Sequence, residues 1–208
     1  MQYFYNDCTR TEGQTLGAES MMKWSGIAAA LAVALILPAQ ADDLSERAAA
    51  SQAAIKGFAS TLQGELVAAM QKGGPVEAIG VCNQRAPAIA AAISEETGWS
   101  VGRTSLKLRN PENAPDEWER AVLEDFDARL AAGTPPTELT HQEVVTEGDE
   151  TVFRFMRAIP TGSVCLTCHG SELGGDIQHA LERLYPDDQA TGYAEGQIRG
   201  AFTIIQRM

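Results

Sequence analysis

Two cysteines and a histidine stand together in the second half of the chain, in the run Cys165-Leu166-Thr167-Cys168-His169. The pattern C-x-x-C-H is typical of sites that attach c-type haem. Two thiols at this spacing fit the two vinyl groups on one edge of a porphyrin, and the adjacent histidine then reaches the iron as proximal ligand. A cysteine pair alone is also compatible with a disulfide, a zinc site or a thioredoxin-like site. The histidine favours covalent haem, held by Cys165 and Cys168.

Attachment of this kind needs export, and a targeting segment lies downstream of the first methionine. Residues 21–41 contain an early lysine, a continuous apolar run and small residues before a cleavage position after Ala41, the order found in secretory signal peptides. The apolar run is shorter than the about 20 residues that a membrane span needs. We therefore expect residues 1–20 to be an upstream extension, and residues 42–208 to form one mature periplasmic domain without a membrane span.

Charge limits the classes of partner, and the cysteine count singles out one further thiol. The chain carries 16 Lys and Arg against 28 Asp and Glu, a formal net charge of −12. This acidity argues against nucleic acid or an anionic membrane surface as a partner. If Cys8 lies upstream of the mature domain and haem occupies the C-x-x-C pair, Cys82 is left without an intramolecular partner in an oxidising compartment.

The elements that must position these residues begin with helices. Apolar residues recur at three- and four-residue steps over residues 44–72, which predicts one long helix that ends at the glycine pair after it. A second helical region is expected over residues 75–96, and Pro87 should kink or break it. If that helix continues, Cys82 shares its apolar face. We therefore expect Cys82 to point toward the core.

The rest of the chain predicts strands mixed with shorter helices. In chain order, we expect a strand over 99–109, a helix over 116–132, a hairpin over 143–159, a short helix over 175–184 and a final strand over 197–207. In the hairpin, alternation places Phe153 and Phe155 on one side and Met156 on the other. Helices followed by antiparallel strands favour an α+β domain. An all-α four-helix cytochrome is the rival architecture, and it does not account for the strands.

The sixth iron ligand is less well determined by spacing. A thiolate is a strong ligand for ferric iron, which favours Cys82. The same residue would also suit a buried apolar position or an intermolecular disulfide. Methionines at such spacings commonly serve packing, and the other histidines suit surface positions. The alternatives to Cys82 are Met70, Met156, His141, His179 or no ligand at all.

Two segments resemble a family of exported c-type haem proteins that was long grouped as a domain of unknown function and has a PAS-like fold. They are Ala-Ile-Gly-Val-Cys-Asn at 78–83, and residues 101–119, which contain Arg-Asn-Pro-x-Asn-x-Pro-x-x-Trp-Glu. Shorter matches are Thr-Cys-His-Gly at 167–170, Tyr-Pro-Asp at 185–187, Gly192-Tyr193 and Gly196. The resemblance implies a PAS-like antiparallel sheet with long N-terminal helices. It also implies haem ligation by a motif histidine and a distal cysteine, which match His169 and Cys82.

Basic residues in the strand predicted over 99–109 suggest a further cofactor contact. Period-two alternation places Arg103, Lys107 and Arg109 on one strand face. Haem carries two propionates, which cations within reach would neutralise. We expect these three residues near the propionates, with a solvated polar face as the alternative.

Together these patterns predict a periplasmic monohaem cytochrome with His169 and Cys82 as axial ligands. The leading function is a redox or small-ligand sensor that acts through an unidentified periplasmic partner protein, because a thiolate closes the iron at rest and weakens as a ligand on reduction. A low-potential electron carrier comes second. A peroxidase-like enzyme comes last, because it needs an open distal site with an acid–base group.

Overall fold

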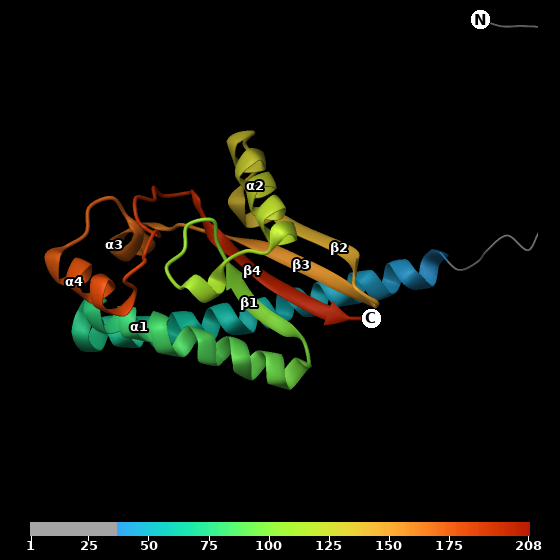
Figure 1. Ribbon diagram of the computed structural model, residues 1–208, viewed down its shortest axis with the longest axis horizontal. Helices are drawn as coiled ribbons and strands as arrows, with labels where there is room; N and C mark the ends of the chain where they lie inside the picture. Colours follow the sequence, from blue (N-terminus) through green and yellow to red (C-terminus); the bar gives the residue numbers. More distant parts are fainter. Residues whose placement is uncertain (1–36) are drawn as a thin grey trace, which may run out of the picture. The chain divides into compact units, whose positions relative to one another are not determined.

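The structure is a computed structural model that describes residues 37–208 (Figure 1). The expected upstream extension, and the expected signal peptide as far as residue 36, lie outside the described residues. Among residues 37–208, no helix is both long enough and apolar enough to cross a membrane.

The longest element is α1, Leu37–Thr97, which is a helical hairpin (Figure 1). Within α1, Gly74 leaves helical geometry, with φ 72° and ψ −161°. Glycine adopts this conformation without steric cost, and the chain turns back there, as the glycine pair predicted. Arg85 of the second arm donates to Glu65 of the first at 2.7 and 2.8 Å. The expected break at Pro87 is wrong: the helix continues through this residue, which lies on the exposed side of the second arm.

Four strands form one antiparallel sheet in the order β1-β4-β3-β2. The predicted hairpin consists of β2, Thr140–Glu147, and β3, Glu150–Pro160, with Gly148 at positive φ in the turn. Strand β4, Ile198–Arg207, lies between β3 and β1, Ser100–Thr104. The sheet and its helices confirm the α+β class, in agreement with a PAS-like arrangement, and the all-α alternative is wrong.

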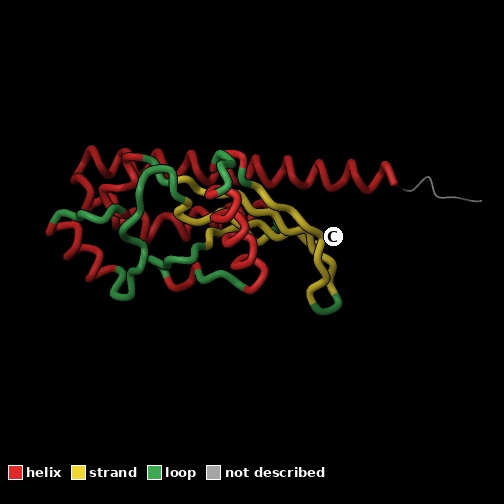
Figure 2. Tube along the Cα trace, turned by 90° about the horizontal axis from the view of Figure 1, so that it is seen from above, coloured by secondary structure: helices red, strands yellow, loops and turns green. Residues whose placement is uncertain are grey.

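Helices cover both faces of this sheet, and Figure 2 shows α1 running along one side of the strands. Phe153, Phe155 and Ile204 pack in one core cluster with residues of α1. Met156 and Ala201 pack in a second cluster with residues of α2, Glu117–Ala131. Because successive side chains of a strand point to opposite faces, β3 is buried on both sides. The predicted separation of the two phenylalanines from Met156 is confirmed.

The Asn-Pro motif builds the connection from β1 to α2. Asn110 caps the 3-10 turn η1, Pro111–Asn113, and the carbonyl of Asn113 accepts a hydrogen bond from the Thr104 hydroxyl at 3.2 Å. Asp116 and Glu119 then form a capping box, with reciprocal hydrogen bonds of 2.7 and 3.1 Å. The helix predicted over 116–132 is therefore confirmed, and the motif fixes where it begins.

Strand β1 is shorter than the strand predicted over residues 99–109, because it ends at Thr104. The Ser105 hydroxyl lies 2.8 Å from the carbonyl oxygen of Arg199 and 3.0 Å from that of Lys107. Hydrogen bonds from a serine to nearby backbone compete with a strand ladder. The argument that placed the three basic residues on one strand face is therefore wrong, and their positions depend on an irregular loop.

The remaining elements lie on the side of the molecule where α1 turns back (Figure 1). They are the 3-10 turn η3, Ser163–Cys165, and the helices α3, Leu166–His169, and α4, Gly175–Leu184. The 3-10 turn η2, Pro136–Glu138, instead connects α2 to β2 and packs against β3. Helix α4 matches its predicted range. Its residues Ile177 and Leu181 form a third cluster with Ile79 of α1, and Cys168 packs at the edge of that cluster.

Candidate functional site

The C-x-x-C-H run forms one tight turn. Cys165 ends η3, and α3 carries Cys168 and His169 directly after it. Within residues 37–208, both cysteines are free, half-buried thiols. Gly170 ends the turn where a side chain has no room, because a Cβ there would lie 2.6 Å from the carbonyl oxygen of Leu166. One short turn therefore carries two thiols and an imidazole within five residues.

The ring of His169 is held through its Nδ1 atom. Nδ1 lies 2.7 Å from the carbonyl oxygen of Ala190 and 3.2 Å from Nε of Arg199. The Tyr193 ring meets the imidazole edge-on, with centroids 6.2 Å apart. Nε2 has no hydrogen-bond partner among residues 37–208. A histidine whose Nδ1 bonds a backbone carbonyl is oriented to bind a metal through Nε2.

Burial keeps the His169 imidazole neutral. It lowers the pKa of His169 from its usual 6.5 to about 3, and the positive charges of Arg199 and Arg109 act in the same direction. The neutral imidazole is the form that ligates metals. His169 therefore needs no loss of charge before it can bind iron.

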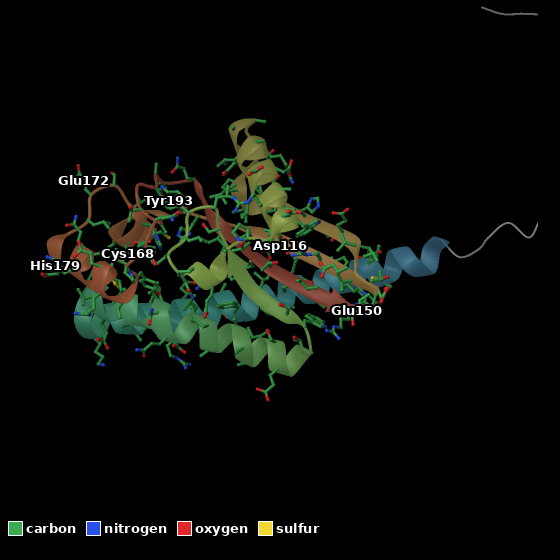
Figure 3. All side chains as sticks on the ribbon, viewed as in Figure 1. Asp116, Glu150, Cys168, Glu172, His179 and Tyr193 are labelled. Carbon is green, nitrogen blue, oxygen red and sulfur yellow. The ribbon has the colours of Figure 1, made fainter. Side chains whose placement is uncertain are left out.

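Arg109 bonds two backbone segments that lie next to His169. Its guanidinium makes a buried ion pair with Asp188, at 3.1 Å from Nε and 3.0 Å from Nη2. Nη2 also donates to the carbonyl of Cys168 at 2.6 Å and to that of Ala190 at 3.2 Å. One arginine thus ties the C-x-x-C-H turn to the loop that supplies the Nδ1 acceptor. Figure 3 shows Cys168 and Tyr193 on this side of the molecule.

Cys82 comes to the same place from the second arm of α1. Burial raises the pKa of its half-buried thiol, and the charges of Arg103, Arg109 and Arg199 oppose that rise. The charge of Cys82 in turn acts on Cys168, whose pKa is raised mainly by burial. Among the described residues, the Cys82 side chain makes no hydrogen bond. The same three arginines act on His169, so the structure brings them together with a thiol from a distant part of the sequence.

The surroundings of Arg103 bear on whether these residues fit a haem, because haem propionates need cationic partners. Its half-buried guanidinium lies over the Phe58 ring, 5.5 Å from the centroid, and has no hydrogen bond or ion pair within residues 37–208. Burial lowers its pKa, while Cys82 and Tyr185 oppose this effect. A partly buried cation without an anion is costly. Free thiols, an oriented imidazole and an unpaired guanidinium are the donor set that a covalent haem with propionates requires.

The other two basic residues predicted for propionates have partners of their own. Lys107 is exposed, and its Nζ donates to the carbonyl of Thr191 at 2.5 Å and lies 4.7 Å from the centroid of Tyr193. Arg109 is engaged with Asp188 as described above. Both lie beside the C-x-x-C-H turn. Propionate contacts for Arg103, Lys107 and Arg109 stay a prediction.

Three of the four rival sixth ligands have described surroundings of their own. Met156 is fully buried in the cluster under α2. His141 packs against Trp118 at 5.5 Å. His179 is exposed on α4 and points outward (Figure 3), and Met70 is half-buried in the first arm of α1. Among residues 37–208, neither histidine makes a hydrogen bond or ion pair with His169 or with a cysteine.

Sequence reasoning missed three residues of the site, Arg199, Asp188 and Ala190. A charged residue in the otherwise apolar run Ile-Arg-Gly-Ala-Phe at 198–202 was an available signal for Arg199. Asp188 and Ala190 carry no local signal, because their role depends on where the loop after α4 passes.

The comparisons with known proteins agree on the family and the fold. The family model described as Tll0287-like matches residues 27–207. The crystal structure of the cyanobacterial haem protein Tll0287 has a TM-score of 0.58 and 21% sequence identity, over 82% of this chain and 96% of that chain. A search among curated proteins finds no match.

Proposed function

The chain belongs to the Tll0287-like family, and from this premise we propose that it is an exported haem protein with one covalently bound c-type haem. Thioethers from Cys165 and Cys168 would hold the haem, and Nε2 of His169 would be the proximal ligand. The observation that carries the proposal comes from the described part of the chain: an imidazole fixed through Nδ1, with Nε2 free, next to two free thiols. The solved structure that bears the family's name is described as a haem protein.

The distal ligand in this proposal is the thiolate of Cys82. Its charge acts on Cys168 and on Arg103, and three of the rivals, Met156, His141 and His179, have surroundings of their own. A bound haem supplies a one-electron iron centre, and a thiolate favours its ferric state. Arg103 would meet a propionate.

The contrast between the two ligands supports a sensor. His169 is fixed by the backbone carbonyl of Ala190, whereas the Cys82 side chain makes no hydrogen bond within the described part of the chain. Cys82 is therefore the ligand that can leave, which would open one side of the site to a small diatomic molecule. A periplasmic partner protein would read the change. An electron carrier, the second candidate, would keep both ligands in both redox states.

Absorption and EPR spectra of the holoprotein test the attachment and the distal ligand. Cys165→Ser combined with Cys168→Ser should abolish covalent haem on a denaturing gel stained for haem. Cys82→Ala should lose the low-spin ferric signal of a thiolate complex while keeping covalent haem. Met70→Leu, a rival ligand in the same helical hairpin, is the matched control and should leave the spectrum unchanged.

Binding of carbon monoxide to the ferrous protein distinguishes the sensor hypothesis from the electron-carrier hypothesis. If Cys82 leaves on reduction, the ferrous wild-type protein should bind carbon monoxide about as readily as Cys82→Ala does. A ferrous protein that excludes carbon monoxide while the variant binds it would favour the carrier. A Cys82→Ala spectrum identical to wild type would refute distal thiolate ligation.

A further inference from the structure

Arg199 lies next to the proximal histidine, although the proposed attachment and ligation do not use it. We propose that the fixed positive charge of Arg199, held beside the proximal histidine, raises the reduction potential of the bound haem. This inference rests on the proposed haem function and deepens it, because it names a residue that offsets the effect of the Cys82 thiolate.

The guanidinium of Arg199 is fixed by contacts that do not involve the histidine. Its Nη1 donates to the Ser105 hydroxyl at 2.9 Å and lies 3.3 Å from the carbonyl of Lys107. The group also lies over the Tyr193 ring, 5.5 Å from the centroid. These anchors come from the loop after β1 and the loop before β4. The cation is therefore held in place by the fold, and half-buried, where water screens it less.

Two groups compete for one nitrogen of His169. The carbonyl oxygen of Ala190, at 2.7 Å from Nδ1, can only accept a hydrogen bond, and Nε–H of Arg199, at 3.2 Å, can only donate one. When Nε2 binds a metal, Nδ1 must carry the remaining proton, and this proton goes to Ala190. The guanidinium of Arg199 would then lie beside a protonated nitrogen, with no hydrogen bond between the two groups.

The positive charge of Arg199 would influence the redox equilibrium of the bound haem. Because Nε–H of Arg199 cannot accept the proton on Nδ1, its effect on the bound haem would be electrostatic. Reduction from ferric to ferrous iron adds one electron and removes one positive charge, so a nearby cation favours the ferrous state.

A potentiometric titration with dithionite, followed by absorption, tests this role in the holoprotein. Arg199→Gln should lower the ferrous-to-ferric ratio at a fixed applied potential by roughly tenfold, or about 59 mV for one electron. Arg199→Lys keeps the positive charge and should stay within about threefold of wild type. Arg207→Gln is the matched control, because it removes an exposed arginine at the far end of the same strand.

The outcomes separate this inference from the proposed function. A wild-type chain without covalent haem would overturn both. If haem is attached and Arg199→Gln titrates like wild type, the tuning role is refuted and the haem assignment stands. If Arg199→Lys shifts as far as Arg199→Gln, shape and not charge is what matters, which also refutes the proposal. Arg199→Lys keeps the test available if Arg199→Gln does not fold.

Discussion

Arg109 and Arg154 are both buried, but they bind different kinds of partner. Arg109 contacts one carboxylate, that of Asp188, and two backbone carbonyls. Arg154 lies over the ring of Trp118 at 4.4 Å. Its guanidinium meets three carboxylates, those of Asp116 at 2.5 Å, Glu119 at 3.7 Å and Glu147 at 3.1 Å.

The difference follows from the surrounding backbone. Around Arg154, strands and the capped helix α2 already satisfy their own hydrogen bonds, so the arginine links side chains of formed elements. Around Arg109 the backbone is irregular, and its carbonyls need donors from elsewhere. Arg109 is therefore part of the conformation of the site, whereas Arg154 stabilises the packing of α2 on the sheet.

Replacing each arginine by alanine tests this contrast and should give the largest effects. Arg109→Ala leaves a buried carboxylate unpaired, which should cost about 3–5 kcal/mol of unfolding free energy and reduce covalent haem per folded molecule. Arg154→Ala should cost about 1–3 kcal/mol, because two of its partners are half-exposed. Urea denaturation and haem content measure the two effects. If Arg154→Ala reduces haem per folded molecule as strongly, the contrast is wrong.

A smaller effect is expected from the turn itself. Gly170→Ala would place a methyl group against the carbonyl oxygen of Leu166, which should destabilise the protein by about 1–3 kcal/mol and distort the position of His169. Gly175→Ala is the control, since no atom lies within 4 Å of its Cβ position. Equal haem incorporation in both variants would show that the turn tolerates the shift.

Acid should lower the free energy of unfolding of the haem-free protein. The folded-state pKa of His169 is about 3, below the usual 6.5, so the unfolded chain binds more protons between these values. Stability should therefore be fully present above pH 6.5 and fall as the pH drops toward 3, with up to about 1.4 kcal/mol per pH unit from this residue. His169→Gln should remove that part of the slope, and His179→Gln should retain it. Thermal or urea unfolding at several pH values measures it.

The smallest effect is expected at the start of α2, away from the site. Asp116→Ala removes the cap of the helix and should cost about 1 kcal/mol with no change in the haem spectrum. Asp125→Ala breaks an exposed pair with Arg129 within the same helix, which should cost about 0.5 kcal/mol or less. A spectral change in Asp116→Ala would mean that α2 and the site are coupled.

Local signals predicted much of the fold. The capping residues of α2 and the glycine turn of the hairpin act within a few residues, so the sequence predicted these elements at nearly their observed bounds. The strand over 99–109 was predicted too long because Ser105 bonds to Arg199, which lies far along the chain. The break at Pro87 was wrong because the proline lies on the exposed side of a helix supported by packing.

The sequence by itself determined which groups can do the chemistry. Cys165, Cys168 and His169 are set by a five-residue spacing, and Cys82 is the one further cysteine among residues 37–208. Only the tertiary structure decided what surrounds them. Asp188, Ala190 and Arg199 reach His169 through loops, and their contacts depend on how the sheet edge, α1 and the loop after α4 meet. Contacts between distant segments leave no spacing pattern in the sequence. Only the folded structure therefore shows that Arg109 bonds the backbone near His169, and that Arg199 places a positive charge beside it.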